Sequence, residues 1–221
     1  MNTALVIGAS GGIGRAISAE LGARGVGVTA LSRSANGIDV TDEASVEAAL
    51  KPLKGPFDLI FVATGALVVN GAEPEKSLRR VSAQAMADQF AVNCIGPSLV
   101  LRHAARLMPR KGRSVFAALS ARVGSIGDNR LGGWYAYRTA KAGLNQMIHS
   151  ASIELARTHR EAICVALHHG TVATDFTAKY AQAHATVPPE DAAKNLLGVL
   201  DGLAPEQTGT FCDWAGKEVP W

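Results

Sequence analysis

The feature that most constrains the fold is a glycine-rich turn near the N-terminus. Residues 3–7 (TALVI) form an apolar run typical of a buried parallel strand. The turn follows at residues 8–14 (GASGGIG), and residues 15–21 then repeat apolar positions at helical spacing. A strand, a glycine turn and a helix in this order predict a phosphate site, because glycine lets the backbone approach the ligand and free amides at the helix start attract anions.

The spacing of this turn is Gly-x-x-x-Gly-x-Gly, carried by Gly8, Gly12 and Gly14. It differs from the Gly-x-Gly-x-x-Gly of the commonest dinucleotide fingerprint, and it lacks the Gly-Lys-Ser/Thr ending of a P-loop. A glycine turn alone is a weak indication of a ligand. Its position after a strand and before a helix strengthens the hypothesis.

Apolar runs alternate with helix-spaced segments along the rest of the chain. Further strands are predicted at residues 25–31, 57–63, 114–119, 162–167 and near 209–212. Helices are predicted at residues 43–50, 82–107 with a bend near Gly96 and Pro97, 134–159 and 190–203. No linker or repeat interrupts the pattern. It predicts an α/β fold in which residues 1–221 form a single doubly wound Rossmann-type domain, with a mostly parallel sheet flanked by helices.

Composition excludes several classes of protein. The 221 residues are 48% apolar and 19% charged, which is typical of a globular domain. The net charge of +3 is small and no basic stripe is present, so we expect no nucleic-acid partner. We also expect a cytoplasmic protein without a membrane segment, because no apolar run reaches membrane-spanning length and the N-terminus lacks a basic leader region.

Metal binding is not predicted. Cys94, Cys164 and Cys212 are widely spaced and lack metal-ligand spacing, so reduced buried thiols are expected. His168 and His169 are adjacent at the end of a predicted strand, where neighbouring side chains point to opposite faces. No third ligand has suitable spacing.

The end of the second strand indicates which dinucleotide is bound. An acidic residue there would hold an adenosine ribose, but the chain has Ser32, Arg33 and Ser34 instead. A cation flanked by hydroxyls suits a 2′-phosphate, which favours NADP over NAD, although a solvated loop arginine is the alternative. Asp39 either accepts a hydrogen bond from an adenine amino group or merely begins the following turn.

Tyr137 and Lys141 share one face of the long predicted helix, because they lie four residues apart. An ammonium beside a phenol favours the phenolate, so the spacing predicts a lowered Tyr137 pKa and proton transfer near neutral pH. Tyr135 is a natural contrast, since the residue four positions on is Thr139. The alternative is a tyrosine and a lysine on a solvated helix face.

Two further polar residues are candidates for the same site. Asn93 lies in an apolar segment, so its amide needs partners: it either ties down the backbone or orders water. Ser120 follows a predicted strand, at the sheet edge where ligands bind in doubly wound folds. A serine there is more often a turn residue than a catalytic one.

Taken together, these residues resemble the short-chain dehydrogenase/reductase superfamily over essentially the whole chain. Segments 120–129, 132–138 and 211–221 are similar to the small carbonyl reductases related to the myxobacterial C-factor. The matching motifs are the cofactor turn at Gly8, Gly12 and Gly14, the adenine-contact pair Asp39 and Val40, the helix asparagine Asn93, the substrate serine Ser120, and Tyr-x-x-x-Lys at Tyr137 and Lys141.

The resemblance implies hydride transfer from NADPH to the carbonyl of a small aldehyde or ketone, or the reverse reaction on an alcohol. Tyr137 would exchange the proton, Lys141 would hold the nicotinamide ribose and lower the tyrosine pKa, Ser120 would orient the carbonyl oxygen, and Asn93 would anchor a water. A homodimer or homotetramer through the long helices is also implied. The implied cofactor contacts are Gly8, Ser10, Gly12, Ile13, Gly14, Arg33, Asp39, Val40, Thr64, Gly65, Tyr137, Lys141, Gly170, Val172 and Thr174.

The chain departs from the family pattern in places. Residues 62–65 read Val-Ala-Thr-Gly instead of Asn-Asn-Ala-Gly, and His169 replaces a proline. Ser125 lies nearer the usual separation from Tyr137 than Ser120 does, but Ser120 matches the motif, with residues 126–134 as an insertion. Residues 176–188 would shape the substrate pocket. The alternative function is a dinucleotide-binding signalling or regulatory protein of the C-factor type.

Overall fold

A six-stranded parallel sheet forms the centre of the computed structural model, which describes residues 1–174 and 186–221. The sheet order is β2-β1-β3-β4-β5-β6, and every adjacent pair is parallel. The predicted doubly wound sheet is confirmed. Its strands are β1 (Thr3–Ile7), β2 (Gly27–Leu31), β3 (Leu59–Val62), β4 (Ser114–Ser120), β5 (Ala162–His168) and β6 (Thr210–Asp213).

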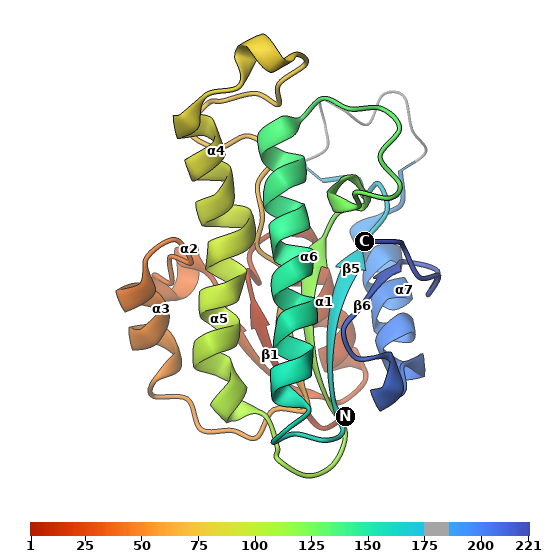
Figure 1. The fold of residues 1–221 in the computed structure, drawn as a ribbon. Coiled ribbons are helices and arrows are strands. Elements are labelled where there is room, and N and C mark those ends of the chain that lie inside the picture. The colour runs from red at the N-terminus through yellow and green to blue at the C-terminus, as the bar shows by residue number, and fades with distance from the viewer. Residues whose placement is uncertain (175–185) are drawn as a thin grey trace.

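Helices cover both faces of this sheet (Figure 1). The helices α3, α5 and α6 pack on one face, and α1 and α7 pack on the other. No helix in the described parts of the chain combines the length and apolar character needed to cross a membrane. The α-helices are α1 (Gly12–Ala23), α2 (Arg33–Asn36), α3 (Glu43–Leu50), α4 (Ala83–Phe90), α5 (Gly96–Ala104), α6 (Tyr135–Leu155) and α7 (Pro189–Gly202).

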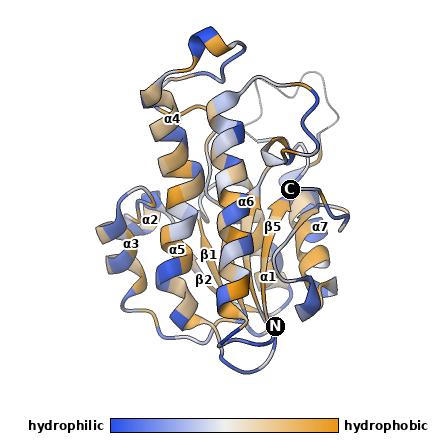
Figure 2. Ribbon diagram, in the orientation of Figure 1, coloured by the Kyte–Doolittle hydropathy of each residue, from blue (hydrophilic) through white to orange (hydrophobic). Residues whose placement is uncertain are grey.

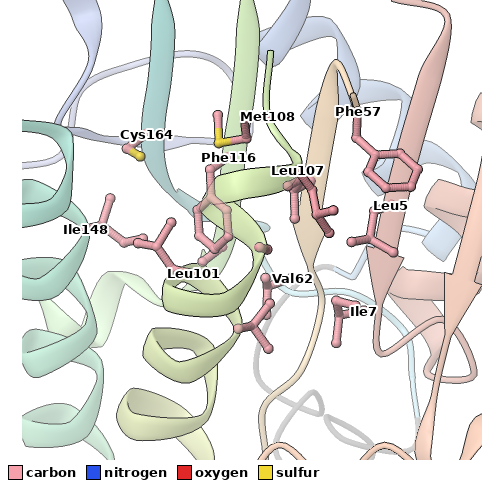
Figure 3. Packing of buried hydrophobic residues seen from close by; sticks show 14 of the residues in the cluster. Leu5, Ile7, Phe57, Val62, Leu101, Leu107, Met108, Phe116, Ile148 and Cys164 are labelled. Atoms are coloured by element: carbon pink, nitrogen blue, oxygen red, sulfur yellow. The ribbon is translucent and has the colours of Figure 1, made fainter. Parts of the chain in front are cut away.

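Side-chain alternation along the strands builds two apolar layers. In β1, Leu5 and Ile7 join the layer beneath α3, α5 and α6, whereas Ala4 and Val6 join the layer beneath α1 and α7. Figure 3 shows part of the first layer, packed around Phe116 of β4. The strands are therefore apolar on both sides, and the hydrophilic residues gather on the outward faces of the helices (Figure 2).

The long helical segment predicted at residues 82–107 is interrupted. Ser82 caps α4 by accepting a hydrogen bond from the Ala85 backbone N–H. A π-helical turn, Ala91–Ile95, then joins α4 to α5, so the irregularity lies just before the predicted bend at Gly96 and Pro97. Such turns displace the backbone by one residue and are frequent at functional sites.

The strand order places a crevice beside β1. From β1 the chain moves outward to β2, and it later returns to form β3 on the other side of β1. The loops that follow β1 and β3 therefore leave the sheet in opposite directions at its carboxyl edge. Ligands bind at this switch point in open α/β sheets.

Candidate active site

The predicted glycine turn connects β1 to α1 with close backbone contact. Gly8 has a φ of +84°, a conformation that glycine adopts without steric cost. A Cβ on Gly14 would lie 2.2 Å from the Gly8 carbonyl oxygen, so only glycine fits there. A Cβ on Gly12 would lie 2.6 Å from Cγ2 of Thr174. With glycine at these three positions, the turn keeps its backbone close to the start of α1, which fits a phosphate group.

A cavity of about 470 Å³ runs from this turn to the predicted catalytic residues. It opens at the carboxyl ends of the strands. Gly11 and His169 line it although they were not among the predicted contacts. The predicted residues in its lining are Ser10, Gly12, Ile13, Thr64, Gly65, Ser120, Tyr137, Lys141 and Thr174.

A second cavity, of about 580 Å³, adjoins the first. The two share Ser10, Thr64 and Gly65 in their linings, so they form neighbouring parts of one cleft along the sheet edge. The predicted residues that line the second cavity are Gly8, Ser10, Arg33, Asp39, Val40, Thr64 and Gly65.

Arg33 and Asp39 face this second cavity from the segment that follows β2. Arg33 is the first residue of α2, whose N-cap Ser32 accepts a hydrogen bond from the Ala35 backbone N–H. The Asp39 carboxylate accepts hydrogen bonds from the Thr41 hydroxyl at 2.7 Å and from its backbone N–H at 2.9 Å. These bonds hold the Asp39 pKa below its usual value. Asp39 therefore stabilises the start of this turn, which is one of the two roles predicted for it.

Ser120 and Ser125 have different surroundings. Ser120 ends β4, is buried and lines the first cavity, and its hydroxyl donates to Oδ1 of Asn145 at 2.6 Å. Ser125 is also buried, but its hydroxyl donates to the Pro220 carbonyl and accepts from the Asp128 backbone N–H. Of the two serines, Ser120 is therefore the one placed beside Tyr137 and Lys141.

Tyr137 and Lys141 lie side by side on α6, as their spacing predicts. The Lys141 Nζ is 5.9 Å from the Tyr137 ring centroid and donates to the Leu119 carbonyl at 2.8 Å. Both side chains are buried, at 5% and 2% exposed. The lowered pKa predicted for Tyr137 is wrong in this structure: burial raises it. Burial also lowers the pKa of Lys141 to about 7, because desolvation disfavours the charged form of each group.

Asn93 lies in the π-helical turn and braces the loop after β3. Its Oδ1 accepts from the Ala66 backbone N–H at 3.1 Å, and its Nδ2 donates to the Ala66 carbonyl at 2.8 Å. The second Nδ2 proton goes to Oε1 of Gln89 at 2.7 Å. Of the two roles left open, tying down the backbone is therefore the one observed. One acceptor lone pair of Oδ1 remains for a water.

The start of α6 is fixed by a residue that sequence reasoning missed. Residues 132–134 all have positive φ, and the chain then enters the helix at Tyr135. Glu75 is buried, its carbonyl accepts from the Trp134 backbone N–H at 2.6 Å, and its Oε2 accepts from the Ala136 backbone N–H at 3.3 Å. Positions 132 and 133 are both glycine, but no local signal in the sequence linked this turn to Glu75.

The segment after β5 contains the remaining predicted contacts. Gly170 has a φ of +73°, and a Cβ there would lie 3.0 Å from Trp214. Val172 is fully buried and pairs with Val187. Of the predicted pocket segment 176–188, residues 176–185 lie outside the described chain.

His169 lines the first cavity, where its Nδ1 is buried without a hydrogen-bond partner in the described structure. Burial lowers its pKa to about 3, so the imidazole is neutral. Within the described residues, no group of three or more metal-ligating side chains is present.

Comparisons with known proteins identify the family of the chain. A family model described as enoyl-(acyl carrier protein) reductase matches residues 8–200. The 1-hydroxy-2-glutathionyl-2-methyl-3-butene dehydrogenase of Rhodococcus sp. (strain AD45) is 34% identical, and the match covers 100% of both chains. The C-signal of Myxococcus xanthus is 41% identical over 62% of this chain and 78% of its own length.

Solved structures show the same architecture. A Burkholderia multivorans short-chain dehydrogenase/reductase with bound NADP has a TM-score of 0.80 and 25% identity, and the match covers 100% of this chain and 99% of that one. NADPH-bound carbonyl reductase from chicken fatty liver has a TM-score of 0.84 and 24% identity, with the same coverage. The chain belongs to the short-chain dehydrogenase/reductase family, and it is an oxidoreductase.

Proposed function

We propose that this oxidoreductase uses NADPH to reduce the carbonyl of a small aldehyde or ketone to an alcohol, with Tyr137 as the proton donor. One observation carries the proposal: a single cavity is lined by both the glycine turn and the side chains of Ser120, Tyr137 and Lys141. A nucleotide phosphate on the turn and a carbonyl beside the phenol would therefore lie in one continuous space.

The cleft would hold a dinucleotide along its length. The cradle from Gly8 to Gly14 would hold the pyrophosphate, and Arg33 in the second cavity would pair with a 2′-phosphate, which favours NADP over NAD. When bound, NADPH supplies the hydride for the carbonyl carbon. The other proposed contacts are Ser10, Ile13, Asp39, Val40, Thr64, Gly65, Gly170, Val172 and Thr174, along with Tyr137 and Lys141.

Tyr137 would deliver the proton to the developing alkoxide. Burial raises its pKa, so the phenol carries its proton at neutral pH, as a general acid must. The Lys141 Nζ, 5.9 Å from the ring centroid, would then stabilise the phenolate left behind. Its other proposed role is to hydrogen-bond the nicotinamide ribose.

Ser120 and Asn93 would support this step. The Ser120 hydroxyl would donate to the carbonyl oxygen and stabilise it as negative charge develops. Asn93 would bind a water through its remaining Oδ1 lone pair, connecting Lys141 to solvent. The two protein partners of Asn93, Ala66 and Gln89, would keep that lone pair in place.

A second candidate is a dinucleotide-binding signalling protein, which the similarity to C-signal supports. A signalling protein of this kind would not need a proton-donating side chain beside its nucleotide site. The Rhodococcus relative is named as a dehydrogenase of a glutathionyl alcohol, so alcohols belong in any substrate panel. We also propose a homodimer or homotetramer in the cytoplasm, which light scattering and fractionation would test.

The test is NADPH oxidation, followed by absorbance, against a panel of aldehydes, ketones and quinones, with NADP⁺ reduction against alcohols as the reverse assay. The proposal predicts turnover with at least one compound and a preference for NADPH over NADH. Tight NADPH binding without turnover on the whole panel would favour the signalling protein.

A further inference from the structure

Asn145 is a buried polar residue directly behind the predicted catalytic serine. It lies on α6 one turn after Lys141 and two turns after Tyr137, so all three share one helix face. Its Oδ1 accepts the Ser120 hydroxyl proton at 2.6 Å. Its Nδ2 is inaccessible to solvent and has no hydrogen-bond partner among residues 1–174 and 186–221. A buried amide donor without a partner is rare and needs an explanation.

The observed hydrogen bond points the serine proton in the wrong direction for catalysis. A hydroxyl has one proton to donate, and here that proton goes to Asn145, which does not line the cavity. A serine that stabilises a developing alkoxide must instead donate that proton to the substrate oxygen. The two hydrogen bonds exclude each other.

A half-turn of the Asn145 amide about its Cβ–Cγ bond resolves both problems. It exchanges the positions of oxygen and nitrogen, which are similar in size. Nδ2 then donates to the Ser120 oxygen, and the serine proton is free to point into the cavity. The Asn145 oxygen takes the position without a partner, and unpartnered carbonyl oxygens are tolerated better than unpartnered N–H groups.

We propose that Asn145 is a positioning residue for Ser120: its amide donates to the serine oxygen when substrate is bound and thereby directs the serine proton to the carbonyl oxygen. This inference rests on the proposed function and deepens it. The effect passes through Ser120, because Ser120 lines the cavity whereas Asn145 contacts the serine and is not part of the lining.

The test is a double-mutant cycle between Asn145→Ala and Ser120→Ala, with kcat, KM and NADPH affinity measured for all four proteins. We expect Asn145→Ala to lower kcat by about 10-fold, which corresponds to about 1.4 kcal/mol of activation free energy. NADPH affinity, read by nicotinamide fluorescence, should stay within about 2-fold of wild type. In the Ser120→Ala background the same substitution should cost nothing further.

Asn145→Asp separates hydrogen-bond donation from shape. Aspartate has the shape of asparagine but no N–H, and it accepts the serine proton more strongly. The proposal predicts a lower kcat for Asn145→Asp than for Asn145→Ala, whereas a packing role predicts the reverse order. Its carboxylate would lie one turn from Lys141, so the comparison is made with NADPH affinity measured alongside.

Three outcomes would overturn the inference. They are wild-type kcat in both Asn145 variants, a kcat for Asn145→Asp above that of Asn145→Ala, or an Asn145→Ala loss that persists in the Ser120→Ala background. If Asn145→Asp does not fold, the alanine cycle alone decides. Full activity of Ser120→Ala would contradict the proposed serine role itself, whereas a Ser120-independent loss overturns only the role of Asn145.

Discussion

The glycine turn after β1 and the side-chain cluster of Ser120, Tyr137 and Lys141 border the same cavity but are built in opposite ways. The turn works through missing side chains, because a Cβ at Gly14 would collide with the Gly8 carbonyl. The cluster works through side chains that are almost completely buried and hydrogen-bonded to distant segments, such as Ser120 to Asn145 and Lys141 to the Leu119 carbonyl. The turn is therefore local and rigid, whereas the cluster depends on the whole fold.

The difference determines what a substitution does in each region. In the turn, a side chain added at Gly14 would overlap the backbone of Gly8. Such a substitution should therefore disrupt both the conformation of the turn and its affinity for a phosphate. In the cluster, conservative changes keep the shape and alter charge or hydrogen bonding alone. Substitutions that affect backbone packing alone, or charge and hydrogen bonding alone, can distinguish the two regions.

The largest effect is expected at Gly14. Gly14→Val should lower the free energy of unfolding by about 4 kcal/mol or more and abolish NADPH binding, because the new atoms meet backbone on the turn. Gly22 is the matched control in the same helix, since a Cβ there meets nothing within 4 Å. Gly22→Ala should raise stability by about 0.5–1 kcal/mol in the same denaturation series. Equal effects at both glycines would contradict the close backbone contact.

Lys141 should make stability depend on pH. Folding lowers its pKa from 10.5 to about 7, so between these values the unfolded chain binds more protons than the folded chain. The free energy of unfolding should therefore rise with pH across this window, by about 4 kcal/mol relative to Lys141→Met, at about 1.4 kcal/mol per unit through its middle and less near its two ends. Urea titrations of both proteins from pH 7 to 10 measure the difference. Parallel curves would show that Lys141 is not buried in this way.

A substitution of Arg33 tests the proposed 2′-phosphate site in the second cavity. Arg33→Ser should raise the KM for NADPH about 10- to 100-fold and leave the KM for NADH unchanged, because a hydrogen bond between charged groups contributes about 1.5–3 kcal/mol. Steady-state kinetics with both cofactors give the ratio. A similar rise for both cofactors would mean that Arg33 shapes the loop and does not contact a 2′-phosphate.

The smallest effect is expected at Glu75, which holds the start of α6. Glu75→Gln keeps an acceptor for the Ala136 backbone N–H but removes the charge beside the helix N-terminus, so stability should fall by about 0.3–1 kcal/mol. Glu75→Ala removes the acceptor too and should cost about 1 kcal/mol more. Thermal or chemical denaturation measures both. A larger loss in the glutamine variant would exclude this capping role.

The same contrast explains what could be predicted from the sequence. The glycine turn and the alternation of strands with helices are set by local residue patterns, and both were predicted. The four-residue spacing of Tyr137 and Lys141 placed them together correctly, but it said nothing of burial, which reverses the expected shift of the tyrosine pKa. Glu75 and Asn145 were missed because their partners lie 61 and 25 residues away in the chain.

The proposed mechanism depends most directly on Tyr137 as the proton donor. Tyr137→Phe removes one hydroxyl, and Tyr135→Phe is the matched control two positions earlier on the same helix. With any substrate that the panel identifies, Tyr137→Phe should lower kcat by about 10²- to 10⁴-fold while NADPH binding stays near normal, and Tyr135→Phe should leave kcat unchanged. Undiminished turnover in Tyr137→Phe would exclude Tyr137 as the proton donor.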